Sequence, residues 1–320
     1  MFERLINHPA FELIFGIGLV TSAGLVIFPP DWLLLKWGAN FAFQFLLGYL
    51  ALGLLFFAVH QTRLMFVCFG CTAVLSLYLK YASNPNIRFE PETDGPSISM
   101  AHFNLGKRTD SLKVLELLRT NRADVISFEE LSPQWDQLFQ QRISDIWPHA
   151  YILPDTGSLG IGVFSRFPFS YIDTFRLGPL VNIEGRVEVD LFPGTGFSFI
   201  FANTLPAVNQ EAFLFLKNNF SFLVEKVKAS KLPLILLGNL HAVPWSEEIR
   251  QFRFNAGLMD SRRSFMPTAD GEVPFLQIPE THIFFSEGLK CTQFSDLSDS
   301  GNANFGIIGK FQFIYDNDHD

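Results

Sequence analysis

The chain has 320 residues, of which 48% are apolar and only 18% are charged, and its formal net charge is −8 at pH 7. These averages are not typical of a single soluble domain. The charge is unevenly distributed: only seven charged side chains fall in residues 1–83, while the rest of the chain has the charge density of an ordinary soluble protein. The acidity also argues against a dedicated nucleic-acid-binding protein, which needs an excess of Lys and Arg to neutralise phosphates. The composition indicates a membrane segment joined to an acidic globular domain.

Three apolar segments in residues 1–83 predict three transmembrane helices, namely Phe11–Phe28, Ala39–Val59 and Leu64–Leu79. The middle segment has 21 residues without a formal charge, and a helix that rises ~1.5 Å per residue crosses a hydrocarbon core of about 30 Å over this length. A cleaved signal peptide is the first alternative, but two further apolar segments follow and no small-residue cleavage site stands out. Buried helices of a soluble core are the second alternative, which the uninterrupted middle segment disfavours.

The remaining sequence divides into a linker and a globular domain. Residues 84–97 contain three prolines, a glycine and mixed charge, which is typical of a linker. Residues 98–320 contain short apolar strands with amphipathic helices between them, and this alternation predicts a layered α/β domain. We expect one helix to begin at Asp110 or Ser111 and another to cover Gln210–Ala229. The expected strands are Ile98–Phe103, Val125–Phe128, Gly160–Ser165, Val187–Leu191, Phe197–Ala202 and Leu232–Leu237.

Seven sequence blocks follow one another through this domain in a fixed order. They are Phe103-Asn104, DVISFEEL (124–131), GVFSRFP (162–168), Arg186, LILLGNLHAVPWS (234–246), IPETHIFFSEGL (278–289) and GNANFGI (301–307). This order resembles the endonuclease/exonuclease/phosphatase superfamily. With three preceding spans, it further resembles a membrane-anchored bacterial subgroup that includes teicoplanin-resistance proteins.

The resemblance implies a four-layered α/β sandwich with an active site at one rim. It also implies hydrolysis of a phosphoester with the help of Mg²⁺, which prefers oxygen ligands. Asn104 and Glu130 stand at the family's metal positions, and Arg186 stands where the family has an arginine, which suggests a phosphate contact.

The catalytic positions, by contrast, have changed. At the family's Gly-Asp-x-Asn motif this chain has Asn239 and His241, so an amide without useful basicity replaces the water-activating carboxylate. Thr281 replaces the aspartate before His282, and Asn304 replaces the terminal histidine. Two further family positions are changed in the same way, Leu205 for a histidine and Ala303 for an aspartate.

Several charged groups have more than one interpretation. His102, Glu130 and His241 together would suit a transition metal such as Zn²⁺ if their side chains converged, although each histidine also fits a structural role. Lys107-Arg108 and Arg166 are either phosphate contacts or ordinary surface charges. We expect Glu247, Glu248 and the acidic C-terminal tail to be solvated.

The sequence therefore predicts a membrane-anchored member of this superfamily that is catalytically degenerate and binds a ligand or partner at the membrane. The alternative is a metal-dependent phosphoesterase for a small or lipid-linked phosphate. Positive charges near the spans are balanced and do not decide the orientation. The subgroup it resembles implies the bacterial inner membrane, with the domain on the outer side.

Overall fold

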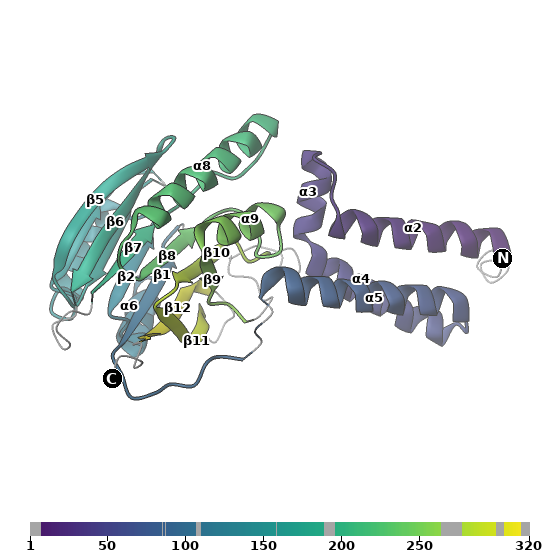
Figure 1. Cartoon of the computed structure of the whole chain (residues 1–320), viewed down its shortest axis with the longest axis horizontal. Helices are drawn as coiled ribbons and strands as arrows, with labels where there is room; N and C mark the ends of the chain where they lie inside the picture. The colour runs from purple at the N-terminus through teal and green to yellow at the C-terminus, as the bar shows by residue number, and fades with distance from the viewer. Residues whose placement is uncertain are drawn as a thin grey trace, which may run out of the picture.

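A computed structural model gives the architecture of residues 8–84, 86, 88–106, 110–157, 159–188, 196–263, 277–298 and 304–314. The chain forms a helical anchor and an α/β sandwich (Figure 1). The anchor helices are α2 (Pro9–Ile27), α3 (Leu33–Asn40), α4 (Ala42–Ala58) and α5 (Thr62–Ser83).

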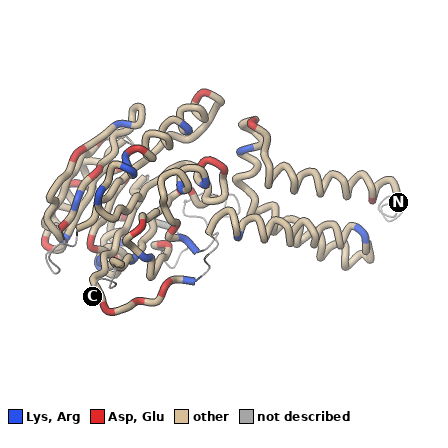
Figure 2. The backbone as a smooth tube through the Cα atoms, in the orientation of Figure 1, with Lys and Arg blue, Asp and Glu red and all other residues tan. Residues whose placement is uncertain are grey.

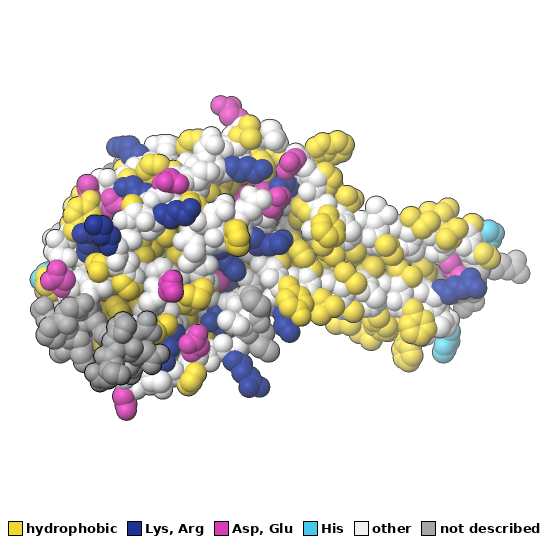
Figure 3. Space-filling view, viewed as in Figure 1, with side chains coloured by type: hydrophobic (Ala, Val, Ile, Leu, Met, Phe, Trp, Pro, Cys, Tyr) yellow, Lys and Arg dark blue, Asp and Glu magenta, His cyan; other side chains and the backbone are white. Residues whose placement is uncertain are grey.

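The anchor contains two helices, α2 and α5, that are long and apolar enough to cross a membrane. Helices α3 and α4 pass the same test only as a pair, and they meet at an angle of 66° near Phe41. The predicted three spans are therefore present only if the bent pair of α3 and α4 forms a single span. Figure 2 shows α2, α4 and α5 almost without charge between their ends, and Figure 3 shows hydrophobic side chains over the visible face of the anchor.

The domain contains two six-stranded sheets. The first has the order β11-β12-β1-β2-β4-β3, and the second has the order β5-β6-β7-β8-β10-β9. The strands of the first sheet are β1 (Ser97–Asn104), β2 (Val125–Glu129), β3 (His149–Leu153), β4 (Ile161–Ser165), β11 (Leu289–Ser298) and β12 (Asn304–Phe313). The strands of the second are β5 (Phe169–Leu177), β6 (Leu180–Glu188), β7 (Gly196–Phe201), β8 (Leu234–Asn239), β9 (Leu258–Asp260) and β10 (Thr281–Ser286).

An apolar core holds the two sheets together, and helices cover their outer faces. Ile98, Phe199 and Phe311 belong to the core between the sheets. Helices α6 (Ser111–Asn121) and α7 (Pro133–Arg142) pack on the first sheet, and α8 (Gln210–Ala229) and α9 (Glu247–Ala256) pack on the second. These layers give a mixed α/β two-sheet sandwich.

The strongest sequence signals agree with the observed elements. Helix α8 has the predicted bounds, and the Asp110 side chain caps α6 by accepting from the Lys113 backbone N–H at 3.2 Å. The prediction for Val187–Leu191 was misplaced, because β6 begins at Leu180 and ends at Glu188, and residues 189–195 lie outside the described ranges.

The anchor is docked directly on the domain through α3, α5 and the start of α9. The Lys36 ammonium lies 2.8 Å from a Glu248 carboxylate oxygen and 3.0 Å from one of Glu247. The Trp245 indole donates to the Ala39 carbonyl at 3.1 Å, and the Tyr78 hydroxyl donates to the Trp245 carbonyl at 3.0 Å. The expectation that Glu247 and Glu248 are both solvated is therefore wrong for Glu248, which is 9% exposed because the anchor covers it.

Candidate functional site at the rim of the sandwich

The rim is formed where strands from both sheets end. Strands β1 and β2 are parallel neighbours, so their terminal residues Asn104 and Glu129 lie side by side. In the second sheet, Phe201 pairs with Leu237, two residues before the end of β8. The ring of His102 lies 5.2 Å from that of Phe201 across the two sheets. The ends of β1, β2, β7 and β8 are therefore on the same side of the sandwich.

The two predicted metal ligands, Asn104 and Glu130, lie close together. A Cβ atom on Gly106 would meet Asn104 Oδ1 at 2.9 Å and Glu130 Oε1 at 3.7 Å, so both side chains face one point beside this glycine. Gly106 and Glu130 both have positive φ, at 39° and 57°. The strained turn after β2 thus points the Glu130 carboxylate back toward the end of β1.

These oxygen donors fit Mg²⁺, which takes one or two carboxylates and keeps several waters. The described residues contain no group of three or more His, Cys, Asp and Glu side chains arranged for a metal. The Zn²⁺ hypothesis for His102, Glu130 and His241 is therefore wrong. The hypothesis fails because His102 is fully buried and its Nδ1 lies 2.9 Å from the Ser127 hydroxyl.

Sequence reasoning missed Glu129, which positions the first ligand. Its Oε1 accepts a hydrogen bond from the Asn104 amide at 2.6 Å and lies 3.5 Å from His102 Nε2. Because the amide nitrogen of Asn104 is held on Glu129, its carbonyl oxygen is directed to the other side, toward Gly106 and Glu130. This role follows from the parallel pairing of the two strand ends, which the local sequence does not reveal.

Asn239, which the sequence resemblance places at a catalytic position, has a local structural role. Its Oδ1 accepts from the backbone N–H of His241 at 3.2 Å, and its own N–H donates to Asn203 Oδ1 at 3.0 Å. Gly238 precedes it with φ at 142°, and a Cβ there would lie 2.1 Å from the Ala202 carbonyl oxygen. This turn therefore requires a glycine at position 238, while the Asn239 amide supplies no base.

His241 faces the anchor. It has a left-handed backbone, and its Nδ1 lies 3.6 Å from a carboxylate oxygen of Glu280, a residue that sequence reasoning missed. Both side chains are about one quarter exposed, at 25% and 23%. They line a cavity of about 340 Å³ with Trp37 and Lys36 of α3 and Phe213 of α8.

His282, at the start of β10, also has a structural role. His282 is 1% exposed, and its Nε2 donates to the Ala242 carbonyl at 2.7 Å. Burial lowers the pKa of His282 from 6.5 to about 3, with nearby Arg262 and Arg253 adding to the shift. Its ring is therefore neutral at pH 7 and cannot serve as an exposed cation beside a phosphate.

The other predicted residues are distributed unevenly. Asn304 begins β12, two residues before Gly306, and Gly306 pairs with Phe103, so the Asn304 backbone reaches the rim. The Asn304 side chain and the residues Asn302 and Ala303 lie outside the described part of the chain. Arg186 pairs with Ser198, which pairs with Leu234 at the start of β8. It thus lies toward the opposite end of the second sheet from Asn239, and the prediction that it joins the rim is not supported.

The remaining predicted cations do not add to the rim. Arg166 forms an ion pair with Asp124 at 3.1 Å, which indicates a structural role. The Arg186 guanidinium lies 5.4 Å from the centre of the Tyr171 ring. Lys107-Arg108 falls outside the described residues.

Comparison with known structures gives the same fold. A structure described as an endonuclease/exonuclease/phosphatase from Beutenbergia cavernae matches with a TM-score of 0.55 and 15% identity over 68% of this chain and 72% of that one. D. rerio TDP2 complexed with a single-strand DNA product matches at 0.56 and 14%, over 68% and 99%. The human Nocturnin catalytic domain with a bound sulfate anion matches at 0.54 and 17%, over 69% and 96%.

Curated protein sequences give no match. A sequence model of one family, however, matches residues 93–302, which is more than half of the chain and includes β1, β2, β7 and β8, whose ends form the rim. The chain therefore belongs to the Endonuclease/Exonuclease/phosphatase family.

Proposed function

We propose that this protein is a membrane-anchored family member whose rim binds a phosphate-containing ligand at the bilayer surface without hydrolysing it. The observation that carries this proposal is the state of Asn239. A non-basic amide occupies the water-activating position, and its carbonyl oxygen is already bound by the His241 N–H. The buried, neutral His282 cannot compensate for it.

Binding, in contrast, retains its residues. Asn104 and Glu130 still face one point, where Mg²⁺ would supply positive charge to phosphate oxygens. The sulfate in the human Nocturnin catalytic domain indicates that this fold accommodates a tetrahedral anion. The cavity between His241 and α3 favours a ligand that reaches the rim from the membrane side. By analogy with the subgroup it resembles, we place the anchor in the bacterial inner membrane and the domain outside.

A second candidate function is metal-dependent phosphoester hydrolysis. It is favoured by the 3.6 Å approach of His241 to Glu280, since a histidine oriented by a carboxylate is a typical general base. In this alternative, His241 takes the role that Asn239 has lost.

An activity assay separates ligand binding without hydrolysis from hydrolysis. It measures the turnover of a chromogenic phosphodiester and a chromogenic monoester by the full chain in detergent, with Mg²⁺, Mn²⁺ or Zn²⁺. We expect native protein, Glu130→Ala and His241→Ala to have the same background rate. Glu116→Ala, an exposed carboxylate on α6, is the matched control. Metal-dependent turnover that both rim variants lose and Glu116→Ala keeps would establish the hydrolase instead.

The proposed binding of a cation at Asn104 and Glu130 is tested separately, by measuring the Tm with and without Mg²⁺. Mg²⁺ should raise the Tm of the native chain and of Glu116→Ala, and should have no such effect on Glu130→Ala. An identical Mg²⁺ response in all three proteins contradicts a cation site at Glu130.

A further inference from the structure

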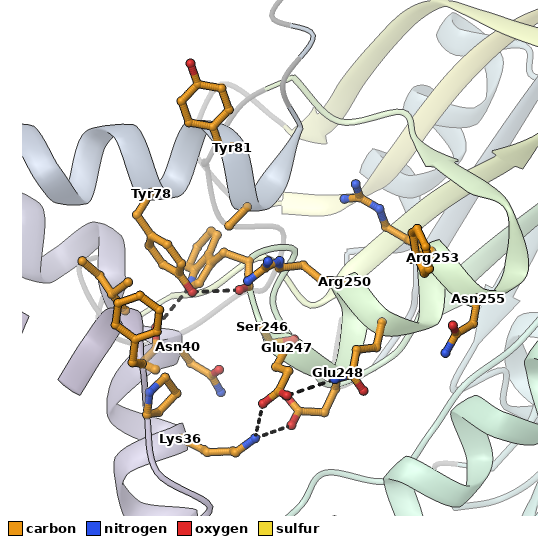
Figure 4. A pocket seen from close by; sticks show the side chains of 18 of the residues that line it. Lys36, Asn40, Tyr78, Tyr81, Ser246, Glu247, Glu248, Arg250, Arg253 and Asn255 are labelled. Carbon is orange, nitrogen blue, oxygen red and sulfur yellow. Dashed lines mark hydrogen bonds and ion pairs between the residues drawn. The ribbon is translucent and has the colours of Figure 1, made fainter. Parts of the chain in front are cut away.

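A second, larger cavity lies between the anchor and α9. Lys36 and Glu248 line both this cavity and the cavity of about 340 Å³ beside His241. The larger cavity has a volume of about 1120 Å³, slightly more than the roughly 300–1,000 Å³ that is usual for ligand pockets in proteins. Figure 4 shows its polar side chains, with Lys36, Tyr78 and Tyr81 from the anchor and Arg250 and Arg253 from α9. The anchor and the domain each supply part of the wall.

The cavity sits where two candidate spans end. Phe28 and Pro29 follow the last residue of α2, and Tyr81 and Ala82 belong to the last turn of α5; all four line it. At the far end of these helices, Arg63 forms an ion pair with Glu12 at 3.1 Å. If α2 and α5 cross the bilayer, as the proposed function requires, the cavity lies at the depth of the lipid headgroups.

Exposed aromatic rings surround the cavity at the same level. Phe28 is 80% exposed, Tyr81 is 67% exposed, and Phe254 on α9 is 87% exposed. Such large exposed rings are costly in water, but they are typical of the interfacial layer of a membrane. Among these rings, Phe254 tells most about the position of the domain relative to the membrane, because it belongs to the domain and not to the anchor. It indicates that this face of α9 touches the bilayer.

The charges of the cavity leave one cation unneutralised. Lys36 is paired with Glu247 and Glu248, and Arg253 lies 3.3 Å from Asp260. Arg250 lines the cavity, is exposed, and forms no ion pair with any residue in the described ranges. In Figure 4 its side chain points toward the Tyr78 hydroxyl across the cavity. An arginine beside a phenol is suited to a singly charged phosphodiester.

We infer that this cavity binds the headgroup of an anionic phospholipid, with its phosphate on Arg250 and its acyl chains along the ends of α2 and α5. The position selects a lipid, the Arg250 guanidinium beside Tyr78 selects a phosphate, and the exposed aromatic rings accommodate the first part of the acyl chains. A bound lipid would then bridge the anchor and α9, in addition to the direct contacts between them.

Native mass spectrometry of the full chain in detergent, titrated with dioleoylphosphatidylglycerol, tests this inference. We expect a one-to-one complex that Arg250→Gln weakens roughly tenfold or more, since it removes a charge-assisted hydrogen bond. Arg142→Gln, an exposed arginine on α7 without an ion pair in the described residues, should bind like the native chain. Dioleoylphosphatidylcholine should bind more weakly, because its choline cation offsets the phosphate charge.

Equal binding of phosphatidylglycerol by the native chain and Arg250→Gln, equal binding of the two lipids, or the lack of any one-to-one complex would overturn the inference. Displacement of the lipid by an equal concentration of inorganic phosphate would also overturn it, because the site would then recognise a free anion. None of these results depends on the Glu130 and turnover measurements, so a failure of the rim proposal and a failure of the lipid site are distinguishable.

Discussion

The rim of the sandwich and the junction with the anchor differ in how their polar groups are used. At the rim, the side chains of Asn239 and His282 form hydrogen bonds with the nearby backbone, and those of Asn104 and Glu130 face one point beside Gly106. At the junction, Lys36 joins two segments more than 200 residues apart in the sequence through Glu247 and Glu248. Polar side chains at the rim thus maintain local structure, whereas charge at the junction is buried to fix the domain on its anchor.

The largest expected effect comes from breaking the junction at Lys36. Lys36→Met leaves the buried Glu248 carboxylate unpaired, which should cost about 3–5 kcal/mol and lower the Tm of the full chain by roughly 10 °C. A thermal melt in detergent measures it.

Lys226→Met is the matched control for this prediction. Lys36 lies 2.8 Å from a carboxylate oxygen of Glu248 and 5.2 Å from the centre of the Phe213 ring. Lys226 likewise lies 2.8 Å from a carboxylate oxygen of Glu184 and 5.0 Å from the centre of the Phe175 ring. This pair is more exposed, at 26% and 20%, so its loss should cost at most about 1 kcal/mol. Equal effects of the two substitutions would contradict a special role of the junction.

An intermediate effect is expected from pH, through His282 at the rim. The pKa of His282 is about 3 in the fold and 6.5 ordinarily, so below pH 6.5 the unfolded chain binds a proton that the folded chain does not. The free energy of unfolding should therefore fall by about 1.4 kcal/mol per pH unit as the pH drops from 6.5 toward 3. Melts between pH 7 and pH 5 should show this fall, and His282→Gln should reduce it. An unchanged pH dependence in that variant would show that the ring is not buried and neutral.

The smallest effect is expected from Trp245→Phe, which removes the indole donor to the Ala39 carbonyl. Because this carbonyl also accepts from the Phe41 backbone N–H, the loss should cost only about 0.5–1.5 kcal/mol. Trp147→Phe is its counterpart inside the sandwich, because the Trp147 indole donates to the Ala123 carbonyl at 2.7 Å. Both should lower the Tm slightly, but only Trp245→Phe should speed hydrogen exchange in α3. Faster exchange of α3 in both variants would mean that the anchor contact is not local to Trp245.

Local patterns were enough to predict part of this structure. Helix α8 followed from its amphipathic spacing, and the meeting of Asn104 and Glu130 followed from motif order together with the family's geometry. The roles of Glu129 and Glu280 were not accessible in this way. Each depends on a neighbour brought close by strand pairing or by a turn, and the residues before and after these glutamates contain no signal for it.

The junction was hidden for a related reason. Glu248 has the sequence context of a solvated residue in the first turn of a helix, and its partner Lys36 is 212 residues away. The middle apolar segment was likewise expected to form one span, but its first two residues, Ala39 and Asn40, belong to α3, which is held against the domain at Lys36 and Trp37. Contacts of such long range are set by the assembled fold and not by periodicity.

The central claim is that the rim has kept its binding geometry and lost its catalytic groups. The most direct test measures metal-dependent hydrolysis of a chromogenic phosphodiester by the full chain carrying Asn239→Asp. Because Thr281 and Asn304 still replace an aspartate and a histidine, we predict a rate no higher than that of the native chain. Metal-dependent turnover restored by this single substitution, and lost again when Glu130→Ala is added, would contradict the claim.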